Sequence, residues 1–218
     1  MDLASLFSVR TILFSFYGYD MSYLELVGTV FNLWAVWLTA NQKTSGWPVG
    51  LVAVLLFMVL FYQIQLYSDF FEQIYYFATN VYGWILWSRK NSTDRAPALP
   101  ITRASHRWIA AAIAITAVGT LLEGSFMARI HQIFPRYFTQ PADYPYLDAF
   151  TTVLSFVGQI FTAHKKMECW WIWAIVNLLG VWLYFTKGVW LLAILFAIFL
   201  GITLKGYLSW RKELGSKA

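Results

Sequence analysis

Apolar residues along this chain gather in long runs, interrupted by shorter polar segments. Seven of these runs have the length of about 17 to 25 residues that an α-helix needs to cross a bilayer. The predicted spans are residues 22–40, 47–67, 69–88, 106–122, 146–164, 169–186 and 188–208. The pattern therefore predicts an all-α integral membrane protein with seven transmembrane helices, which passes the membrane several times.

The second half of the sequence repeats the first at a shift of 123 positions. The superposed pairs are Glu25 and Asp148, Ala40 and Ala163, Lys43 and Lys166, Trp47 and Trp170, Gly83 and Gly206, and Trp87 and Trp210. Three spans reverse the direction of the chain, so the Ala-rich span 106–122 must act as a connector if the two copies are parallel. This predicts two parallel three-helix repeats in a 3+1+3 order, as in SWEET-like transporters.

The spans divide the chain into five predicted regions. They are an N-terminal interfacial segment (1–21), a first three-helix repeat (22–88), a cytoplasmic linker with the connector helix and an external loop (89–145), a second three-helix repeat (146–210) and a cytoplasmic tail (211–218). The N-terminus lacks the basic region and cleavage site of a secretory signal peptide, so we expect no cleaved signal.

Basic residues gather in alternate connections between the spans. With the N-terminus outside, the inner segments hold Lys43, Arg89, Lys90, Arg95, Arg103, Arg107, Lys165, Lys166, Arg211, Lys212 and Lys217. The outer segments hold Arg10, Arg129, Arg136 and Lys187. Because cytoplasmic loops carry an excess of Lys and Arg, this distribution predicts an N-out/C-in orientation.

The composition narrows the chemistry. With 59% apolar and 12% charged residues, the chain is far more apolar than soluble domains are. The single cysteine, Cys169, excludes an intrachain disulfide, and no cluster of cysteines and histidines predicts a metal site. There is no phosphate-binding loop for a nucleotide. We expect no metal, no cofactor and no catalytic residues.

Polar side chains form a stripe on the third span. Gln73 and Asn80 lie seven residues apart and share a helical face with Asp69 and Tyr76. Buried polar groups are costly unless they are satisfied, so the stripe is a seam between helices or the wall of a cavity. The equivalent positions of the second repeat are mostly apolar, and this asymmetry favours a ligand-lining role. Interhelical hydrogen bonding remains the alternative, and Asp69 has a second alternative as a helix cap.

A second stripe follows the fifth span, where Thr152, Ser155 and Gln159 share a face with Asp148. The span at 169–186 contributes Trp173, Asn177 and Tyr184 close to one face, while Trp182 lies off that face. Asp148 suits a capping role at its helix N-terminus. Trp170 suits an anchor at the membrane interface.

Several of these residues lie in motifs with a familiar order. They are L-Y-S-D at 66–69, Y-G-W-x-x-W at 82–87, D-A-F-T-T from 148, E-C-W-W-I-W-A-I-V-N ending at 177, Y-F-T-K-G from 184 and G-Y-x-x-W at 206–210. Together they resemble PnuC-type transporters of nicotinamide riboside over nearly everything after residue 22. The chain departs from that pattern at Val54, the counterpart of Asn177, where many relatives are expected to carry an amide.

The resemblance implies a transporter of the bacterial inner (plasma) membrane that imports nicotinamide riboside by facilitated diffusion and alternating access. A separate cytoplasmic kinase would trap the substrate. The expected substrate-binding residues are Gln73, Tyr76, Asn80, Thr152, Ser155, Gln159, Trp173, Asn177, Trp182 and Tyr184. Amides suit the carboxamide and ribose, and aromatic rings suit the pyridinium cation. The other expected partner is the lipid bilayer. We expect no nucleic acid, and a homo-oligomer is left open.

Other functions are weighed against this one. Thiamine, riboflavin or a nucleoside could be the substrate of the same fold. A retinal protein would use Lys205 as the Schiff base, with an acidic residue such as Asp69, but Lys205 precedes Trp210 and basic residues as an inner-end lysine does. An intramembrane enzyme needs paired catalytic groups. His106, His131 and His164 instead lie in loops or at helix ends and share no face.

Overall fold

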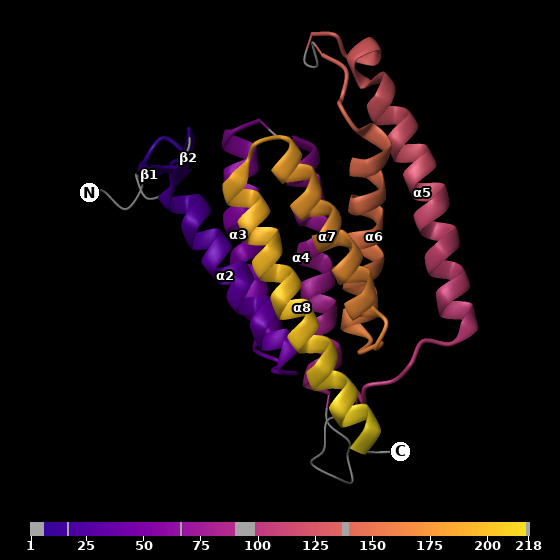
Figure 1. Cartoon of the computed structure of the whole chain (residues 1–218). Coiled ribbons are helices and arrows are strands. Elements are labelled where there is room, and N and C mark those ends of the chain that lie inside the picture. Colours follow the sequence, from indigo (N-terminus) through magenta and orange to yellow (C-terminus); the bar gives the residue numbers. More distant parts are fainter. Residues whose placement is uncertain (1–6, 17, 66, 90–98, 137–139, 217–218) are drawn as a thin grey trace.

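Seven helices and a short hairpin make up the described part of the computed structural model, which covers residues 7–16, 18–65, 67–89, 99–136 and 140–216 (Figure 1). The helices are α2 (Tyr23–Ala40), α3 (Gly46–Gln63), α4 (Tyr67–Ser88), α5 (His106–Ile133), α6 (Pro145–Ala163), α7 (Cys169–Thr186) and α8 (Trp190–Ser216). Strands β1 (Ile12–Phe16) and β2 (Tyr19–Ser22) pair antiparallel. The predicted all-α class is confirmed.

The turns between helices recur at the 123-residue shift found in the sequence. Gln42 and Lys165, which follow α2 and α6, both have a left-handed backbone, with φ of 58° and 49°. Gln65 and Gly188, which follow α3 and α7, do so as well, with φ of 62° and 73°. The bounds of α3 and α7 differ by the same shift. The repeat therefore extends to the local backbone geometry that ends each helix.

Six of the helices form a closed ring. Following their principal contacts, α2 packs on α3, α3 on α4, α4 on α6, α6 on α7, α7 on α8, and α8 again on α2. Helix α5 stands outside this ring against α6 (Figure 1). The groups α2–α4 and α6–α8 thus meet along two lines, α4 with α6 and α2 with α8. We call the end near β1 and β2 the hairpin end and the opposite end the C-terminal end.

The largest buried cluster lies at the C-terminal end, around four tryptophans from both groups of helices. Trp47 meets Trp87 edge to face at 5.4 Å between ring centroids, and Trp170 meets Trp210 at 5.1 Å. Trp87 and Trp210 join the two pairs at 6.0 Å, and Trp87 Nε1 donates to the carbonyl of Ala163 at 3.0 Å. We refer to Trp47, Trp87, Trp170 and Trp210 as the tryptophan quartet.

Two glycines make room for these rings. A Cβ atom added at Gly83 would clash with the ring of Trp47, and one at Gly206 would clash with the ring of Trp170. Trp170 is consequently only 3% exposed, and its prediction as an anchor at the membrane interface is wrong. The indole fits inside because its neighbour has no side chain, which the hydrophobic pattern of one helix does not reveal.

Helix α5 extends beyond the predicted connector. The sequence predicts an external loop from residue 123, but the helix continues to Ile133. Packing explains this difference, because Gly124 is buried against the ring of Tyr146 on α6 and Ile130 is also buried. Helix α8 likewise runs into the predicted tail, where the side chain of Gln42 bonds with Glu213.

Parts of the predicted terminal regions and of the predicted region 89–145 lie outside the described residues, namely 1–6, 17, 90–98, 137–139 and 217–218. The predicted N-terminal interfacial segment contains β1 and most of β2, which form the hairpin. Ser15 bonds with Asp20 across the two strands, and Tyr19 bonds with Glu25 on α2. The placement of this segment at the membrane surface remains a prediction.

Replacing Gly206 by alanine should destabilise the protein by about 1–3 kcal/mol, because the new methyl group overpacks the ring of Trp170. Gly201→Ala on the same helix is the matched control, since nothing lies within 4 Å of its added Cβ. Thermal unfolding in detergent measures both variants. Equal melting temperatures would contradict the packing described for the tryptophan quartet.

Candidate functional site

The two least apolar helices of the ring face each other. Five of the seven helices are long and apolar enough to cross a membrane by themselves, and α4 and α6 are not among them. Polar side chains in lipid need partners inside the protein. The polar side chains of α4 and α6 find such partners on each other, along the line where the two groups of helices meet. This contact is the natural place to look for a site.

Hydrogen bonds and rings join α4 to α6. Thr152 Oγ1 donates to Glu72 Oε1 at 3.4 Å, and the Tyr75 hydroxyl donates to the carbonyl of Phe156 at 2.8 Å. The ring of Tyr76 lies 5.7 Å from that of Phe156, and its hydroxyl lies within reach of Ser155. We call this contact the α4–α6 seam: Glu72, Tyr75, Tyr76, Thr152, Ser155 and Phe156. It brings together three of the predicted site residues, Tyr76, Thr152 and Ser155.

The two amides of the α4 stripe have different surroundings. Gln73 is 9% exposed, and its side chain has no hydrogen-bond partner among the described residues. Asn80 donates to the carbonyl of Tyr76 on its own helix at 2.7 Å and occupies the space that Gly50 leaves between α3 and α4. The amide of Gln73 can therefore take a further partner, while Asn80 packs within its own group of helices.

The second repeat also holds a buried amide between its last two helices. Asn177 Nδ2 donates to Thr203 Oγ1 at 3.0 Å, between α7 and α8. Thr203 is the counterpart of Asn80, so each repeat keeps an amide at the same level but supplies it from a different helix. Trp173 stands where the first repeat has Gly50, and its Nε1 donates to Thr162 Oγ1 at 3.0 Å.

Three predicted site residues lie apart from these contacts. Gln159 is half-buried on α6, one turn beyond Ser155. Tyr184 stacks on Phe196 of α8, with 5.3 Å between ring centroids. Trp182 is 49% exposed and touches Tyr144 outside the ring of helices. Trp182 is thus the predicted residue that the structure separates most clearly from the rest.

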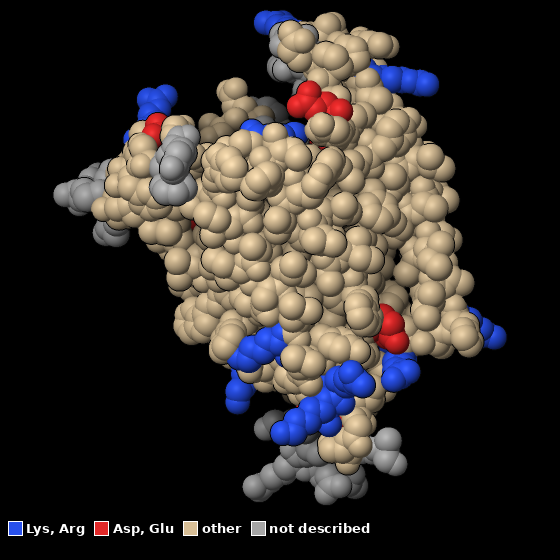
Figure 2. Space-filling model, viewed as in Figure 1, with Lys and Arg blue, Asp and Glu red and all other residues tan. Residues whose placement is uncertain are grey.

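Carboxylates gather at the hairpin end above the α4–α6 seam. Asp69 of α4 lies close enough to Asp148 of α6 to interact electrostatically, and Glu72 interacts in the same way with Asp69 and with Glu123 of α5. We call Asp69, Glu72, Glu123 and Asp148 the acidic mouth. Figure 2 shows acidic and basic side chains at this end of the molecule, whereas Lys and Arg side chains dominate the opposite end. An end rich in acidic groups favours cations over anions.

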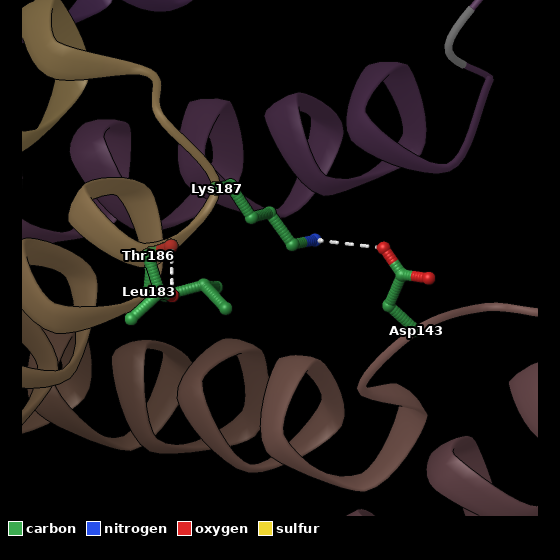
Figure 3. Close-up of polar contacts among 4 residues, drawn as sticks. All are labelled: Asp143, Leu183, Thr186 and Lys187. Carbon is green, nitrogen blue, oxygen red and sulfur yellow. Dashed lines mark hydrogen bonds and ion pairs between the residues drawn. The ribbon is translucent and has the colours of Figure 1, made fainter.

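One lysine borders the acidic mouth. Lys187 Nζ lies 3.9 Å from Asp143 Oδ2 (Figure 3). Its ammonium lies 5.7 Å from the ring centroid of Tyr144. Neighbouring Thr186 donates its hydroxyl to the carbonyl of Leu183 at 2.8 Å, which closes the last turn of α7. The carboxylate of Asp143 is well exposed, so this ion pair contributes little to stability.

Two titratable groups lie in the connections at opposite ends of the ring. His164 follows α6 at the C-terminal end, where Nε2 and the Tyr82 hydroxyl are 2.9 Å apart and burial lowers the pKa of the imidazole. Burial and the bond to Glu25 raise the pKa of the Tyr19 hydroxyl in the hairpin. Both groups are therefore neutral near pH 7.

Lys205 does not face the acidic mouth. Its ammonium lies 2.8 Å from the ring centroid of Trp37, in the last turns of α2, whereas Asp69 lies in the first turn of α4. These two turns are at opposite ends of the ring. The pairing that a retinal protein requires is therefore not formed by these two residues.

Sequence reasoning missed half of the α4–α6 seam: Glu72, Tyr75 and Phe156. The signal was present on α4, where Glu72, Tyr75, Tyr76 and Thr79 follow one another at spacings of three, one and three residues. This row lies directly beside the stripe of Gln73 and Asn80. Phe156 carried no comparable signal, because its role depends on its backbone carbonyl and on the partner helix.

Seven helices, five of them long and apolar enough to cross a membrane, define a multi-pass membrane protein. Comparison with known proteins specifies the family. The profile of the family described as nicotinamide mononucleotide transporter matches residues 22–212, and the chain belongs to this family. The resemblance to PnuC-type transporters drawn from the sequence motifs is confirmed.

Three similar proteins illustrate the family. The nicotinamide riboside transporter PnuC of Escherichia coli (strain K12) is 32% identical, over 92% of this chain and 91% of that protein. The riboflavin/roseoflavin transporter RibM of Streptomyces davaonensis is 28% identical, over 85% and 83%. The crystal structure of the vitamin B3 transporter PnuC has the same fold, with a TM-score of 0.66 and 21% identity over 90% of this chain and 83% of that one. These relatives are transporters and not enzymes.

Removing the partner of Asn177 tests whether this amide is held by the protein itself. Thr203→Val should destabilise the fold by about 1–3 kcal/mol, because it leaves a buried amide without its hydrogen bond. Thr79→Val is the control, since the Thr79 hydroxyl bonds only to carbonyls of its own helix. If both variants unfold at the same temperature in detergent, Asn177 does not depend on Thr203.

Proposed function

We propose that this protein imports nicotinamide riboside across the bacterial inner membrane by facilitated diffusion. The observation that carries the proposal is the acidic mouth above a seam of hydroxyls, rings and an unpaired amide. Nicotinamide riboside joins a permanently cationic pyridinium to a carboxamide and a ribose. The positive charge of the pyridinium complements the acidic mouth. The carboxamide and the ribose can form hydrogen bonds with the α4–α6 seam and with Gln73.

Each part of the substrate has a suitable partner along this path. The carboxamide offers a donor and an acceptor, which the amide of Gln73 can match in both directions. Ribose hydroxyls can bond with Ser155, Thr152 and Gln159 on α6. Tyr76 and Trp173 present rings to a cation, an interaction worth about 2 kcal/mol in a desolvated site. Asn80 and Asn177 serve chiefly to order their own helix pairs, and Tyr184 borders the mouth.

The acidic mouth also discriminates among the alternative substrates. Thiamine shares the positive charge of nicotinamide riboside, whereas riboflavin and nucleosides are neutral. The acidic groups of the mouth therefore favour the two cations, and the amide of Gln73 favours the one that carries a carboxamide. The relative named for riboflavin is a reason to include that vitamin in every comparison.

We also propose that α2–α4 and α6–α8 are parallel repeats in a 3+1+3 order, with α5 as the connector. The shared helix bounds, the matching left-handed turns and the ring of contacts all support a pseudo-twofold axis through the ring. The basic C-terminal end supports an N-out/C-in orientation, which places the acidic mouth outside. Substrate would then enter at the hairpin end.

Alternating access would consist of relative movement of the two repeats, with the tryptophan quartet closing the inner end. Indole Nε1 atoms of Trp47, Trp170 and Trp210 are buried without partners among the described residues. Unpaired buried donors are costly, so hydration on opening would offset part of the lost ring packing. Substrate would move down its concentration gradient. A separate cytoplasmic kinase would trap it inside the cell and so maintain the gradient that drives import.

Calorimetry on the detergent-purified protein tests the proposed substrate. Nicotinamide riboside should bind more tightly than thiamine, riboflavin or a nucleoside, and Gln73→Leu should weaken its binding by about tenfold, because a buried amide contact is lost. Gln63→Leu is the matched control, since Gln63 contacts Phe7 and Val9 near the hairpin.

One result would contradict the proposed substrate, and a second would contradict the proposed site. The first is binding of another of the four compounds with none of nicotinamide riboside. The second is unchanged affinity in a folded Gln73→Leu variant, which would remove Gln73 from the site while leaving the substrate in place.

A further inference from the structure

The turns that follow α2 and α6 share one backbone geometry at the C-terminal end of the ring. Gln42 and Lys165 are counterparts at the 123-residue shift, and both have a left-handed backbone. The backbone N–H of Gln42 donates to the carbonyl of Thr39 at 2.9 Å, and that of Lys165 donates to the carbonyl of Thr162 at 3.0 Å. This conformation is uncommon for residues other than glycine. Its recurrence gives the two side chains equivalent starting points on the backbone.

Each of these side chains crosses from its own group of helices to the other. Lys165, which follows α6, places its ammonium 4.5 Å from the ring centroid of Trp87 on α4. Gln42, which follows α2, donates from its side-chain amide to the carboxylate of Glu213 on α8. Glu213 lies three residues after Trp210, the counterpart of Trp87. Both side chains therefore reach the end of the last helix in the opposite group.

Burial strengthens both contacts. Lys165 is 6% exposed and Trp87 is 5% exposed. A buried ammonium needs compensation for its lost hydration, and the face of an indole ring supplies part of it. Gln42 and Glu213 are half-buried, and a hydrogen bond to a charged group is stronger where water is partly excluded. The two contacts therefore favour the arrangement in which the groups of helices meet at this end.

The turn after α6 joins α4 at two further points. Nε2 of His164 and the hydroxyl of Tyr82 lie 2.9 Å apart. Trp87 Nε1 donates to the carbonyl of Ala163 at 3.0 Å. Residues 163–165 thus contact α4 in succession through a carbonyl, an imidazole and an ammonium, so this turn moves with α4 as long as the C-terminal end stays closed.

We propose that Gln42 and Lys165 are gate residues that hold the C-terminal end of the ring closed. We call the pairs Gln42 with Glu213 and Lys165 with Trp87 the latch contacts. The tryptophan quartet fills this end, and the latch contacts set how often it opens. When the two groups of helices separate, water replaces the carboxylate and the indole ring as partners of the two side chains. This inference rests on the proposed alternating access, but it concerns the gate and not the substrate.

The reactivity of Cys169 measures opening of this end. Cys169 is the only cysteine of the chain, and it is fully buried in the same cluster as the tryptophan quartet. A buried thiol reacts with an alkylating reagent only when local opening exposes it. In the detergent-purified full chain, Lys165→Met and Glu213→Ala should each raise the rate of alkylation by N-ethylmaleimide about tenfold, because each removes one latch contact.

Two exposed lysines next to these positions provide matched controls. Lys43 adjoins Gln42, and Lys212 adjoins Glu213. Lys43→Met and Lys212→Ala should therefore react at the rate of the unaltered protein. Thr203→Val calibrates the effect of lower stability alone, because the bond that it removes lies within one group of helices. Compared at the same interval below each melting temperature, both latch variants should react faster than Thr203→Val.

An unchanged rate in either folded latch variant would overturn the proposal. A rate no higher than that of Thr203→Val in this comparison would also overturn it, because the contacts would then serve general stability. Glu213→Ala, at a half-buried position near the end of α8, keeps the test decisive if Lys165→Met does not fold. The measurement uses no substrate, so its failure is distinct from a failure of nicotinamide riboside to bind in calorimetry.

Discussion

The structure depends on a constraint of the bilayer, that polar side chains at membrane depth must find partners inside the protein. Helices α4 and α6 carry more polar residues than a helix exposed to lipid can, and they are placed against each other. Glu72 with Thr152 and Tyr75 with Phe156 are the bonds that result. Once these two helices face each other, the two groups of three must meet there, and the proposed substrate path runs beside the same contact.

The ring of helices divides its chemistry between two ends. The hairpin end holds the acidic mouth, and the C-terminal end holds the tryptophan quartet and most of the basic residues (Figure 2). Under the proposed function, the acidic mouth attracts the cationic substrate and the aromatic packing closes the other end. The glycines at 83 and 206 allow the packing, because each lets an indole ring approach the backbone of the neighbouring helix. Attraction and closure therefore use separate sets of residues.

Much of the fold could be predicted from the sequence, because its signals are local or periodic. The 123-residue shift anticipated helix ends such as those after Ala40 and Ala163, and the family motifs led to the right family. Contacts between helices were harder to predict. The sequence position of Trp170 indicated an anchor at the membrane interface, because the space that Gly206 leaves for its ring belongs to another helix. The contacts of Glu72 and Phe156 likewise depend on the partner helix. Asn80 and Asn177 looked alike in sequence, yet each is held differently within its own repeat.

The most direct test of the account is counterflow in proteoliposomes made without an ion gradient. Vesicles preloaded with unlabelled nicotinamide riboside should accumulate the labelled compound, because a facilitator exchanges its substrate in both directions. Vesicles preloaded with thiamine, riboflavin or a nucleoside should not accumulate labelled nicotinamide riboside. Exchange of one of those three compounds, with none of nicotinamide riboside, would contradict the proposed function while leaving the fold and the family unchanged.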